Sequence, residues 1–426
     1  MSSHANKVVN SSAQSPSAVS TATAEGDYLT RFKKNTQRSV KAMLTRVQED
    51  QTPTLVQATR VSALHVLSYA LRLPEAWPAT SALLVALAPK LEQAGYRTEW
   101  LAYLQQGVAM SRQCQDLHST AELYLQIGLL YRLQSQLTDA RTALEQSIDL
   151  FFALDEQRDE ARALNQLAYV AWQQHQHDEV RALAQRALER LPTNDLARAM
   201  SLSALGLNAL EEQQWQQAVT YHRMALGIRA EHGNRKEMAW SLQNLAYALR
   251  GQGEYETAII YFEEALTILD EVQDPAHSAI VQMNLGITYS QQGNPHKALE
   301  LYTQAETTFR RLGDQWYLAK VLTNQGIDCL ALQEWSRAEE CFALATNLFA
   351  LLNDASERLN ALDGLGLSYL KQKRAAEALA TFEAVLADLH QIQGTRAYPN
   401  LLQVIDKQIA QAQESVEQSL NDEVIG

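Results

Sequence analysis

Apolar residues in the middle of the chain recur at intervals of three and four, which is the spacing of a single helix face. Leu242, Leu245 and Leu249 form one such face. A turn with two glycines follows at residues 251–253, and a second apolar run with the same spacing comes after it: Ile259, Phe262, Leu266 and Leu269. The pattern therefore predicts two helices joined by a short turn.

This helix pair returns at an interval of forty residues. The segments 239–246, 279–286 and 319–326 align without gaps, and each begins with alanine. Two further alanine positions in each unit keep the same interval: Ala258 and Ala265, Ala298 and Ala305, Ala338 and Ala345. Gly286, Gly326 and Gly366 each cost roughly 1 kcal/mol inside a helix, so another helix is expected to pass close to them. A fixed period of this length is typical of a stacked array rather than a single closed core.

The register extends in both directions from these units. Upstream, the glycine position falls on Gly206, Ala168 and Gly128. Seven units are therefore predicted between residues 121 and 394, and a degenerate unit is predicted before them, with helices over residues 83–96 and 98–113. Pro89 is expected to kink or end the first of these two helices, because proline cannot donate a backbone hydrogen bond.

Besides the small residues, an aromatic residue precedes the second helix in several units: Trp215, Tyr255 and Trp335. This combination resembles the tetratricopeptide repeat, over roughly three quarters of the chain. Forty residues exceed the usual thirty-four of this family. The longer unit is similar to the repeats of kinesin light chains, of spindle-orienting adaptors and of sensor regions in bacterial signalling NTPases, although no NTPase motif is present. The resemblance implies an all-α fold: a right-handed α-solenoid (superhelix) of about eight helix pairs with N- and C-terminal capping helices.

The flanking segments differ from the repeats in composition. Residues 1–26 are rich in Ser, Ala and Thr and are expected to be disordered, because they have little to bury. Residues 27–50 predict a basic amphipathic helix, which either docks on the acidic array, serves as a linker, or contacts a membrane or nucleic acid; docking or a linker role is favoured. Residues 54–120 are assigned to a capping helix and the degenerate repeat, and residues 399–421 to a C-terminal capping helix.

Charge is distributed unevenly along the chain, whose net charge is −13. Residues 1–50 carry seven basic and four acidic residues, whereas the remainder carries 29 basic and 45 acidic ones. An acidic body argues against nucleic acid as the ligand, since phosphate binding needs clustered basic charge. The excess of acidic residues either keeps the protein soluble or attracts basic segments of a partner.

Cysteine content and hydropathy indicate the compartment. Cys114, Cys329 and Cys341 are odd in number and lack metal-ligand spacing, which favours buried thiols in a reducing environment. No apolar run reaches the length of a membrane span, and the first residues lack the apolar core of a signal peptide. A cytoplasmic location is therefore expected, without membrane contact.

Motifs for catalysis are not found. There is no phosphate-binding glycine loop, dinucleotide fingerprint, zinc-protease helix or nucleophile elbow. His175 and His177 with Asp178 lie in a predicted turn among adjacent residues, which disfavours a metal site. We therefore expect no catalytic residues, no metal, no cofactor and no enzymatic activity.

The resemblance implies that the first helices of the pairs line a concave groove and that their second, fifth, sixth, ninth and twelfth positions point into it. The candidate binding residues at these positions are Trp240, Gln243, Asn244, Tyr247, Arg250, Met283, Asn284, Lys320 and Asn324. In kinesin-light-chain-like and peptide-pheromone-receptor-like arrays, asparagine at the sixth position holds a peptide backbone.

The asparagines Asn244, Asn284 and Asn324 are spaced forty residues apart. An amide both donates and accepts, so each can pair with the backbone of an extended peptide. The alternative is that they only tie neighbouring helices together. Trp240 and Tyr247, with Met283, would supply apolar contact, and Arg250 or Lys320 would take an acidic side chain.

These features predict a non-catalytic scaffold or adaptor that binds a protein or an extended peptide in the groove. Two alternatives remain: a regulatory sensor whose superhelix responds to peptide capture and switches a separate effector, and a rigid assembly factor for a multiprotein enzyme or defence complex. The partner is expected to be a protein or peptide, and the chain itself can be a homo-oligomer or a subunit of a larger complex.

Overall fold

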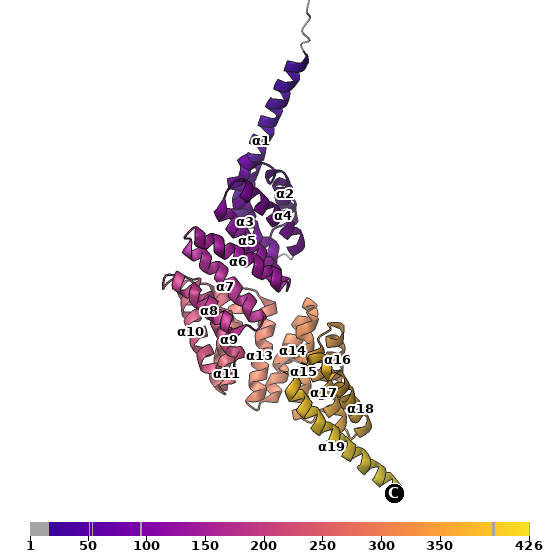
Figure 1. Cartoon of the computed structure of the whole chain (residues 1–426). Coiled ribbons are helices and arrows are strands. Elements are labelled where there is room, and N and C mark those ends of the chain that lie inside the picture. Colours follow the sequence, from indigo (N-terminus) through magenta and orange to yellow (C-terminus); the bar gives the residue numbers. More distant parts are fainter. Residues whose placement is uncertain (1–16, 51, 53, 94–95, 394–396, 426) are drawn as a thin grey trace, which may run out of the picture. The chain divides into compact units, whose positions relative to one another are not determined.

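The computed structural model describes residues 17–425 apart from 51, 53, 94–95 and 394–396. Throughout these residues the regular elements are helices, and within each of the two units described below consecutive helices pack against one another (Figure 1). The predicted all-α class is confirmed. The chain divides into two compact units, residues 1–193 and 194–426. None of the described helices is long and apolar enough to cross a membrane.

Unit 1 holds an N-terminal helix bundle and the first two regular helix pairs. Its helices are α1 (Ser17–Glu49), α2 (Gln57–Ala70), α3 (Trp77–Gln93), α4 (Arg97–Gln113), α5 (Leu117–Leu133), α6 (Leu137–Ala153), α7 (Gln157–Gln173) and α8 (His177–Arg190). A core cluster joins α1 to α5 and includes the fully buried Trp100. The helices α5 to α8 form two successive pairs.

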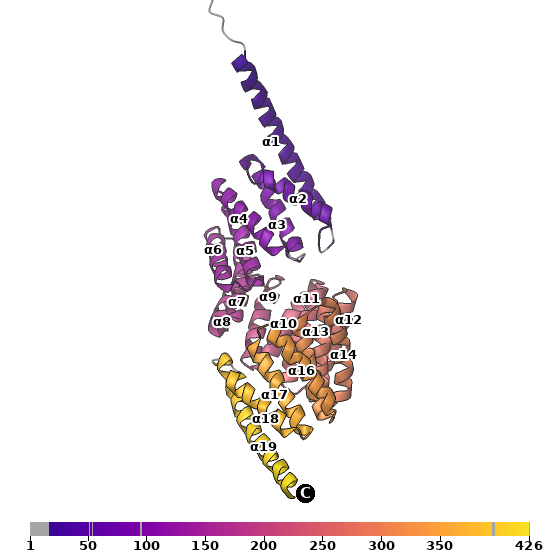
Figure 2. The same ribbon diagram turned by 90° about the vertical axis from the view of Figure 1, so that its right-hand side faces the viewer.

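Helix α1 is longer than the sequence indicated. Residues 17–26, which were expected to be disordered, continue the helix toward its N-terminal end (Figure 2), while residues 1–16 of the same expected tail lie outside the described residues. Once the packed part of the helix has formed, each further residue adds a hydrogen bond at little cost. The expectation of disorder was therefore wrong for these ten residues.

The basic helix docks within its own unit. Val40, Met43 and Val47 belong to the core cluster, and α1 contacts α2 and α3. The Lys33 ammonium pairs with Glu75, whose backbone oxygen also accepts from Gln37 Nε2 at 2.8 Å. The docking surface is thus the N-terminal bundle, and the apolar face of α1 is part of the core.

Pro89 was expected either to kink or to end its helix, and the structure shows that it does not end it. Helix α3 begins at Trp77, six residues before the predicted start, and continues through Pro89 to Gln93. Leu83, Leu84 and Leu87 are fully buried in this helix. Tertiary packing of this apolar face compensates for the hydrogen bond that proline cannot make.

Unit 2 holds five further helix pairs and a long final helix. The pairs are α9 (Arg198–Glu211) with α10 (Trp215–Glu231), α11 (Arg235–Gly251) with α12 (Tyr255–Glu271), α13 (Pro275–Gln291) with α14 (Pro295–Leu312), α15 (Gln315–Ala331) with α16 (Trp335–Leu351), and α17 (Ala355–Lys371) with α18 (Ala375–Asp388). The final helix α19 (Ala397–Ile425) buries Leu401, Ile405 and Ala412 in a cluster with Phe382.

The recurring glycines accommodate rings rather than a neighbouring backbone. A Cβ added at Gly286 would lie 2.5 Å from the Tyr302 ring, and one at Gly326 would lie 2.7 Å from Phe342. Real Cβ atoms do not approach other atoms so closely. The expected close approach at these positions is therefore present, and it is made by a large side chain from the second helix of the same pair.

Aspartates at the turns between pairs connect successive repeats. Asp354 caps α17 by accepting from the Glu357 backbone N–H at 3.1 Å, and it also accepts from Trp316 Nε1 at 3.0 Å. Asp274 caps α13 in the same way and pairs with Lys236 at 2.7 Å. Each cap thus binds a side chain from the first turn of the preceding first helix.

Replacing Asp354 by alanine is expected to lower the free energy of unfolding by about 1 kcal/mol, because both the helix cap and the partner of Trp316 are lost. Urea unfolding followed by circular dichroism measures the change. Asp354→Asn is the matched control and should retain most of the stability, since asparagine also caps helices well. An unchanged midpoint for the alanine variant would contradict this role.

Candidate binding site

The three predicted asparagines occupy equivalent positions on α11, α13 and α15, and each of these helices contacts the next first helix. All three side chains are half-buried. Asn284 Nδ2 donates to the Ile280 oxygen of its own helix at 3.1 Å. Asn324 Nδ2 is buried and has no partner within the described part of the chain. The three amides are therefore only partly accessible, and Asn324 is the one whose Nδ2 has an unmade hydrogen bond among the described residues.

The aromatic residues predicted for this face are accessible. Trp240 and Tyr247 are each 38% exposed. The Trp240 ring lies 5.3 Å from the ring of His277, and Arg250 stacks 4.5 Å above the Tyr247 ring. These aromatic groups leave apolar surface beside the asparagines.

The predicted cations are already engaged within the protein. Arg250 donates to the Asn284 backbone oxygen at 3.2 Å, and burial lowers the pKa of its guanidinium. Lys320 forms an ion pair with Glu357 at 2.8 Å. Both side chains therefore connect one first helix to the next, and an acidic partner residue would have to compete for them.

The structure also tests how far the remaining predicted side chains are accessible. Met283 is only 6% exposed and belongs to a core cluster, so its expected place on the groove surface is wrong. Its flexible side chain fills space between packed helices, as methionine commonly does in protein cores. Gln243 is half-buried on the same helix as Asn244.

Unit 1 carries a pocket on the corresponding face of its first helices. Its volume is about 650 Å³. It is lined by Gln48 of α1, by Ser81, Ala82, Val85 and Ala86 of α3, by His118, Ser119, Glu122 and Leu123 of α5, and by Asp159 and Arg162 of α7. Helix α3 thus supplies a mostly apolar wall, while α5 and α7 supply the charged groups.

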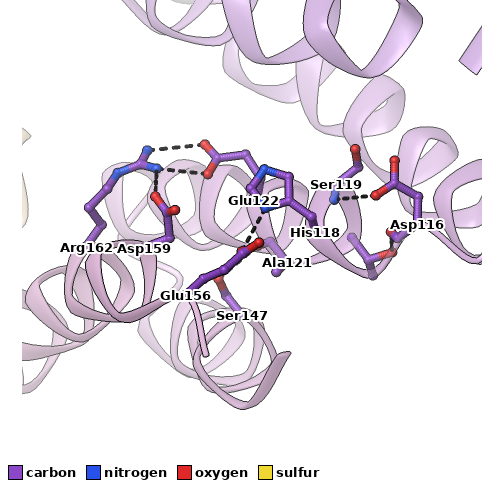
Figure 3. Close-up of polar contacts among 10 residues, drawn as sticks. Asp116, His118, Ser119, Ala121, Glu122, Ser147, Glu156, Asp159 and Arg162 are labelled. Carbon is purple, nitrogen blue, oxygen red and sulfur yellow. Dashed lines mark hydrogen bonds and ion pairs between the residues drawn. The ribbon is translucent and has the colours of Figure 1, made fainter. Parts of the chain in front are cut away.

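An ion-pair network crosses the pocket from α5 to α7 (Figure 3). The Arg162 guanidinium binds both oxygens of Glu122, at 3.0 and 3.2 Å, and Asp159 Oδ1 at 2.8 Å. Gln126 Nε2 also donates to Glu122, at 2.9 Å. Burial by itself lowers the pKa of Arg162, but the two carboxylates outweigh burial and the pKa is raised.

His118 forms a second ionic contact beside this network. Its Nδ1 lies 2.7 Å from Glu156 Oε2 (Figure 3). The hydrogen bond with Glu156 raises the pKa of the imidazole, against the opposing effect of burial. Glu122 is 6% exposed, whereas the Arg162 side chain is 41% exposed. The Arg162 side chain is therefore accessible in the pocket, whereas its carboxylate partner Glu122 is buried.

The chemistry of both regions suits binding. Over the described residues, no three His, Cys, Asp or Glu side chains are grouped so that they could hold a metal ion. What both regions offer is half-buried polar groups beside exposed aromatic or aliphatic surface, which is typical of recognition sites.

The predicted site omitted the residues of the unit 1 pocket. His118, Glu122, Asp159 and Arg162 were not singled out from the sequence. Glu122 and Arg162 are nevertheless separated by forty residues and hold the position that Trp240 and Lys320 hold in later repeats. Applying the same groove positions to the first two repeats would have found this pair.

Stacked helix pairs with a small residue at fixed intervals define the class of α-solenoids. Family models described as tetratricopeptide repeat match residues 119–193, 195–271, 237–311 and 360–388, which together exceed half of the chain. The chain therefore belongs to the tetratricopeptide repeat family. No curated protein matches the sequence.

Solved structures of helical repeat proteins are similar to this chain. A signal transduction ATPase with a tetratricopeptide repeat sensor, from Pyrococcus horikoshii, has a TM-score of 0.56 at 14% identity, covering 91% of this chain and 66% of that one. A Rap protein complexed with Competence and Sporulation Factor has a TM-score of 0.54 at 14% identity, covering 90% and 99%. Aspartyl phosphate phosphatase F from Bacillus subtilis has a TM-score of 0.53 at 14% identity, covering 85% and 95%. At these identities the likeness concerns the fold.

Proposed function

We propose that the chain is a non-catalytic interaction scaffold that binds an extended segment of a protein partner on the face formed by its first helices. The observation that carries the proposal is the asparagine column of unit 2, whose half-buried amides lie on three successive first helices beside exposed aromatic rings. An extended peptide presents backbone donors and acceptors at regular intervals, and repeated amides can pair with them.

The comparisons are consistent with this function. One of the similar structures holds a Rap protein in complex with Competence and Sporulation Factor, and another carries a tetratricopeptide repeat sensor. A third is named as a phosphatase, but a likeness in fold at 14% identity does not transfer an activity. A scaffold of this kind would gain most of its affinity from a few apolar anchors, with Trp240 and Tyr247 as candidates in unit 2.

The test uses random twelve-residue peptides displayed on phage and selected on the full-length protein. Affinities of the selected peptides are then measured by fluorescence anisotropy. Replacing Asn244, Asn284 and Asn324 together by alanine should weaken binding at least about tenfold, because each lost amide leaves backbone groups of the peptide unpaired.

The matched control changes three exposed residues at a single position of the second helices, Thr267, Thr307 and Asn347, to alanine. This control should bind as the unaltered protein does. Equal affinity of the asparagine variant and the unaltered protein would favour an assembly factor that uses another surface. Failure of the selection to yield any binding peptide would contradict peptide capture altogether.

A further inference from the structure

The unit 1 pocket has two walls of different character. Ala82, Val85 and Ala86 of α3 form an aliphatic wall, and Glu122, Asp159 and Arg162 of α5 and α7 line the pocket as an ionic network. Lysine and arginine side chains combine an apolar stem with a charged tip, so they match such a pair of walls. A volume of about 650 Å³ lies within the range of small-ligand sites and has room for such a side chain together with neighbouring backbone.

The charged groups in and beside the pocket are acidic on balance. Glu122 and Asp159 line the pocket with Arg162 and His118, and Glu156 lies beside the lining, bound to His118. The net charge of these five groups is −1 when His118 is protonated and −2 when it is neutral. Cations are therefore attracted to the pocket, and anions are repelled, in either state of the histidine.

Arg162 is committed to its own carboxylates. One of its terminal nitrogens bonds both Glu122 and Asp159, and the other bonds Glu122. An anionic ligand would have to displace these contacts and leave the buried Glu122 without its ionic partner, which is costly. A cation needs no such displacement, because the Asp159 side chain remains 28% exposed.

We infer that the unit 1 pocket receives a lysine or arginine side chain of a protein segment bound to unit 1, with Asp159 as the accepting carboxylate and Glu122 and Glu156 adding to the attraction. The aliphatic stem packs on Val85 and Ala86, which are half-buried and line the pocket. This inference rests on the proposed function, because it assigns a residue type to the segment that the first-helix face binds. Glu122 and Arg162 act as positioning residues, since their mutual pairing fixes the geometry around Asp159.

The test uses the peptides selected on the full-length protein. They are expected to share a lysine or arginine at one position. Replacing that residue by an uncharged analogue of similar length, norleucine for lysine or citrulline for arginine, should weaken binding about tenfold, as for loss of one hydrogen-bonded charge. Asp159→Asn should weaken the unmodified peptide to a similar extent and should make the peptide substitution nearly neutral.

Asp149→Asn is the matched control, because it removes the same charge from an exposed position on α6 outside the pocket. It should leave the affinity unchanged. Glu156→Gln changes a carboxylate beside the pocket, bound to His118, and is expected to weaken binding. Selected peptides that lack a basic residue would overturn this inference while leaving the scaffold proposal intact. So would an equal loss of peptide affinity in the Asp159→Asn and Asp149→Asn variants. Peptides enriched in acidic residues would overturn it in favour of an anion site at Arg162. A selection that yields no peptide would overturn both proposals.

Discussion

Replacing Phe342 by alanine is expected to lower the free energy of unfolding by about 3 to 5 kcal/mol, the usual range for a buried aromatic residue. Phe342 is 1% exposed. Its ring lies against Gly326 of its own repeat and Gly364 of the next, where an added Cβ would be 2.7 and 2.4 Å away. One ring thus fills the space between two first helices, and its removal leaves a cavity that glycine cannot fill.

The effect should be confined to neighbouring repeats, because repeats in a solenoid contact only their neighbours. Denaturant unfolding gives the overall loss, and hydrogen exchange should show faster exchange in α15, α16 and α17 than elsewhere. Leu344→Ala on the same helix is the matched control, since that side chain is 48% exposed and should cost less than about 0.5 kcal/mol. Similar losses for the two variants would show that the ring does not connect the repeats.

The helix pairs and their stacking could be predicted because the same packing residues recur at the same positions in each repeat. Gly286, Gly326 and Gly366 are spaced by forty residues, and so are the rings of Tyr302, Phe342 and Phe382 that cover them. A rule repeated in this way is evident in the sequence even when a single unit is ambiguous. The family and the all-α solenoid class followed from it.

The accessibility of individual side chains could not be predicted in the same way. Met283 and Trp240 both occupy predicted groove positions, yet Met283 is buried and Trp240 is 38% exposed. The difference depends on how the following repeat packs against each position. Arg250 illustrates the same limit, because its contact with the Asn284 backbone exists only once α11 and α13 are side by side.

The unit 1 pocket was harder to foresee because its lining residues are far apart in sequence. Gln48 and Val85 come from the N-terminal bundle, where the repeat pattern is weak, and Arg162 comes from the second regular repeat. Helix α1 was recognised as amphipathic, but its place in the core depends on α2 and α3, neither of which shows the forty-residue pattern clearly. Periodicity alone does not place such elements.

His222 should make the protein lose about 2 kcal/mol of stability between pH 7 and pH 5. It occupies the ring position held by Tyr302 and Phe342 in later repeats, is fully buried against Gly206, and both its nitrogens lack a partner among the described residues. Burial, aided by the nearby charge of Arg229, lowers the pKa of the imidazole to about 3. The unfolded chain takes up a proton below about pH 6.5, while the folded protein does not, so stability falls with pH in that window.

His222→Phe should remove this loss, because phenylalanine suits the position, as Phe342 shows, and does not titrate. The measurement is the free energy of unfolding at pH 7 and pH 5 for the variant and the unaltered protein. His232→Phe is the matched control: this histidine lies at the end of the same helix and is exposed to solvent. It removes a histidine from the same helix without altering the buried ring position.

The comparison must be made between variants, because another buried group acts in the opposite direction. Burial raises the pKa of Asp363 to about 6. As the pH falls from 7 to 5 the folded protein protonates this carboxyl while the unfolded chain, with a pKa near 3.9, stays charged, so this group stabilises the fold at lower pH. The two effects offset each other in the unaltered protein, whose stability can therefore change little. His222→Phe removes only the His222 contribution and leaves those of Asp363 and His118 in place. The stability of the variant at pH 5 relative to pH 7 should therefore exceed that of the unaltered protein by about 2 kcal/mol. A variant with the same pH dependence as the unaltered protein would contradict this, because it would show that His222 takes up its proton as readily in the folded protein as in the unfolded chain.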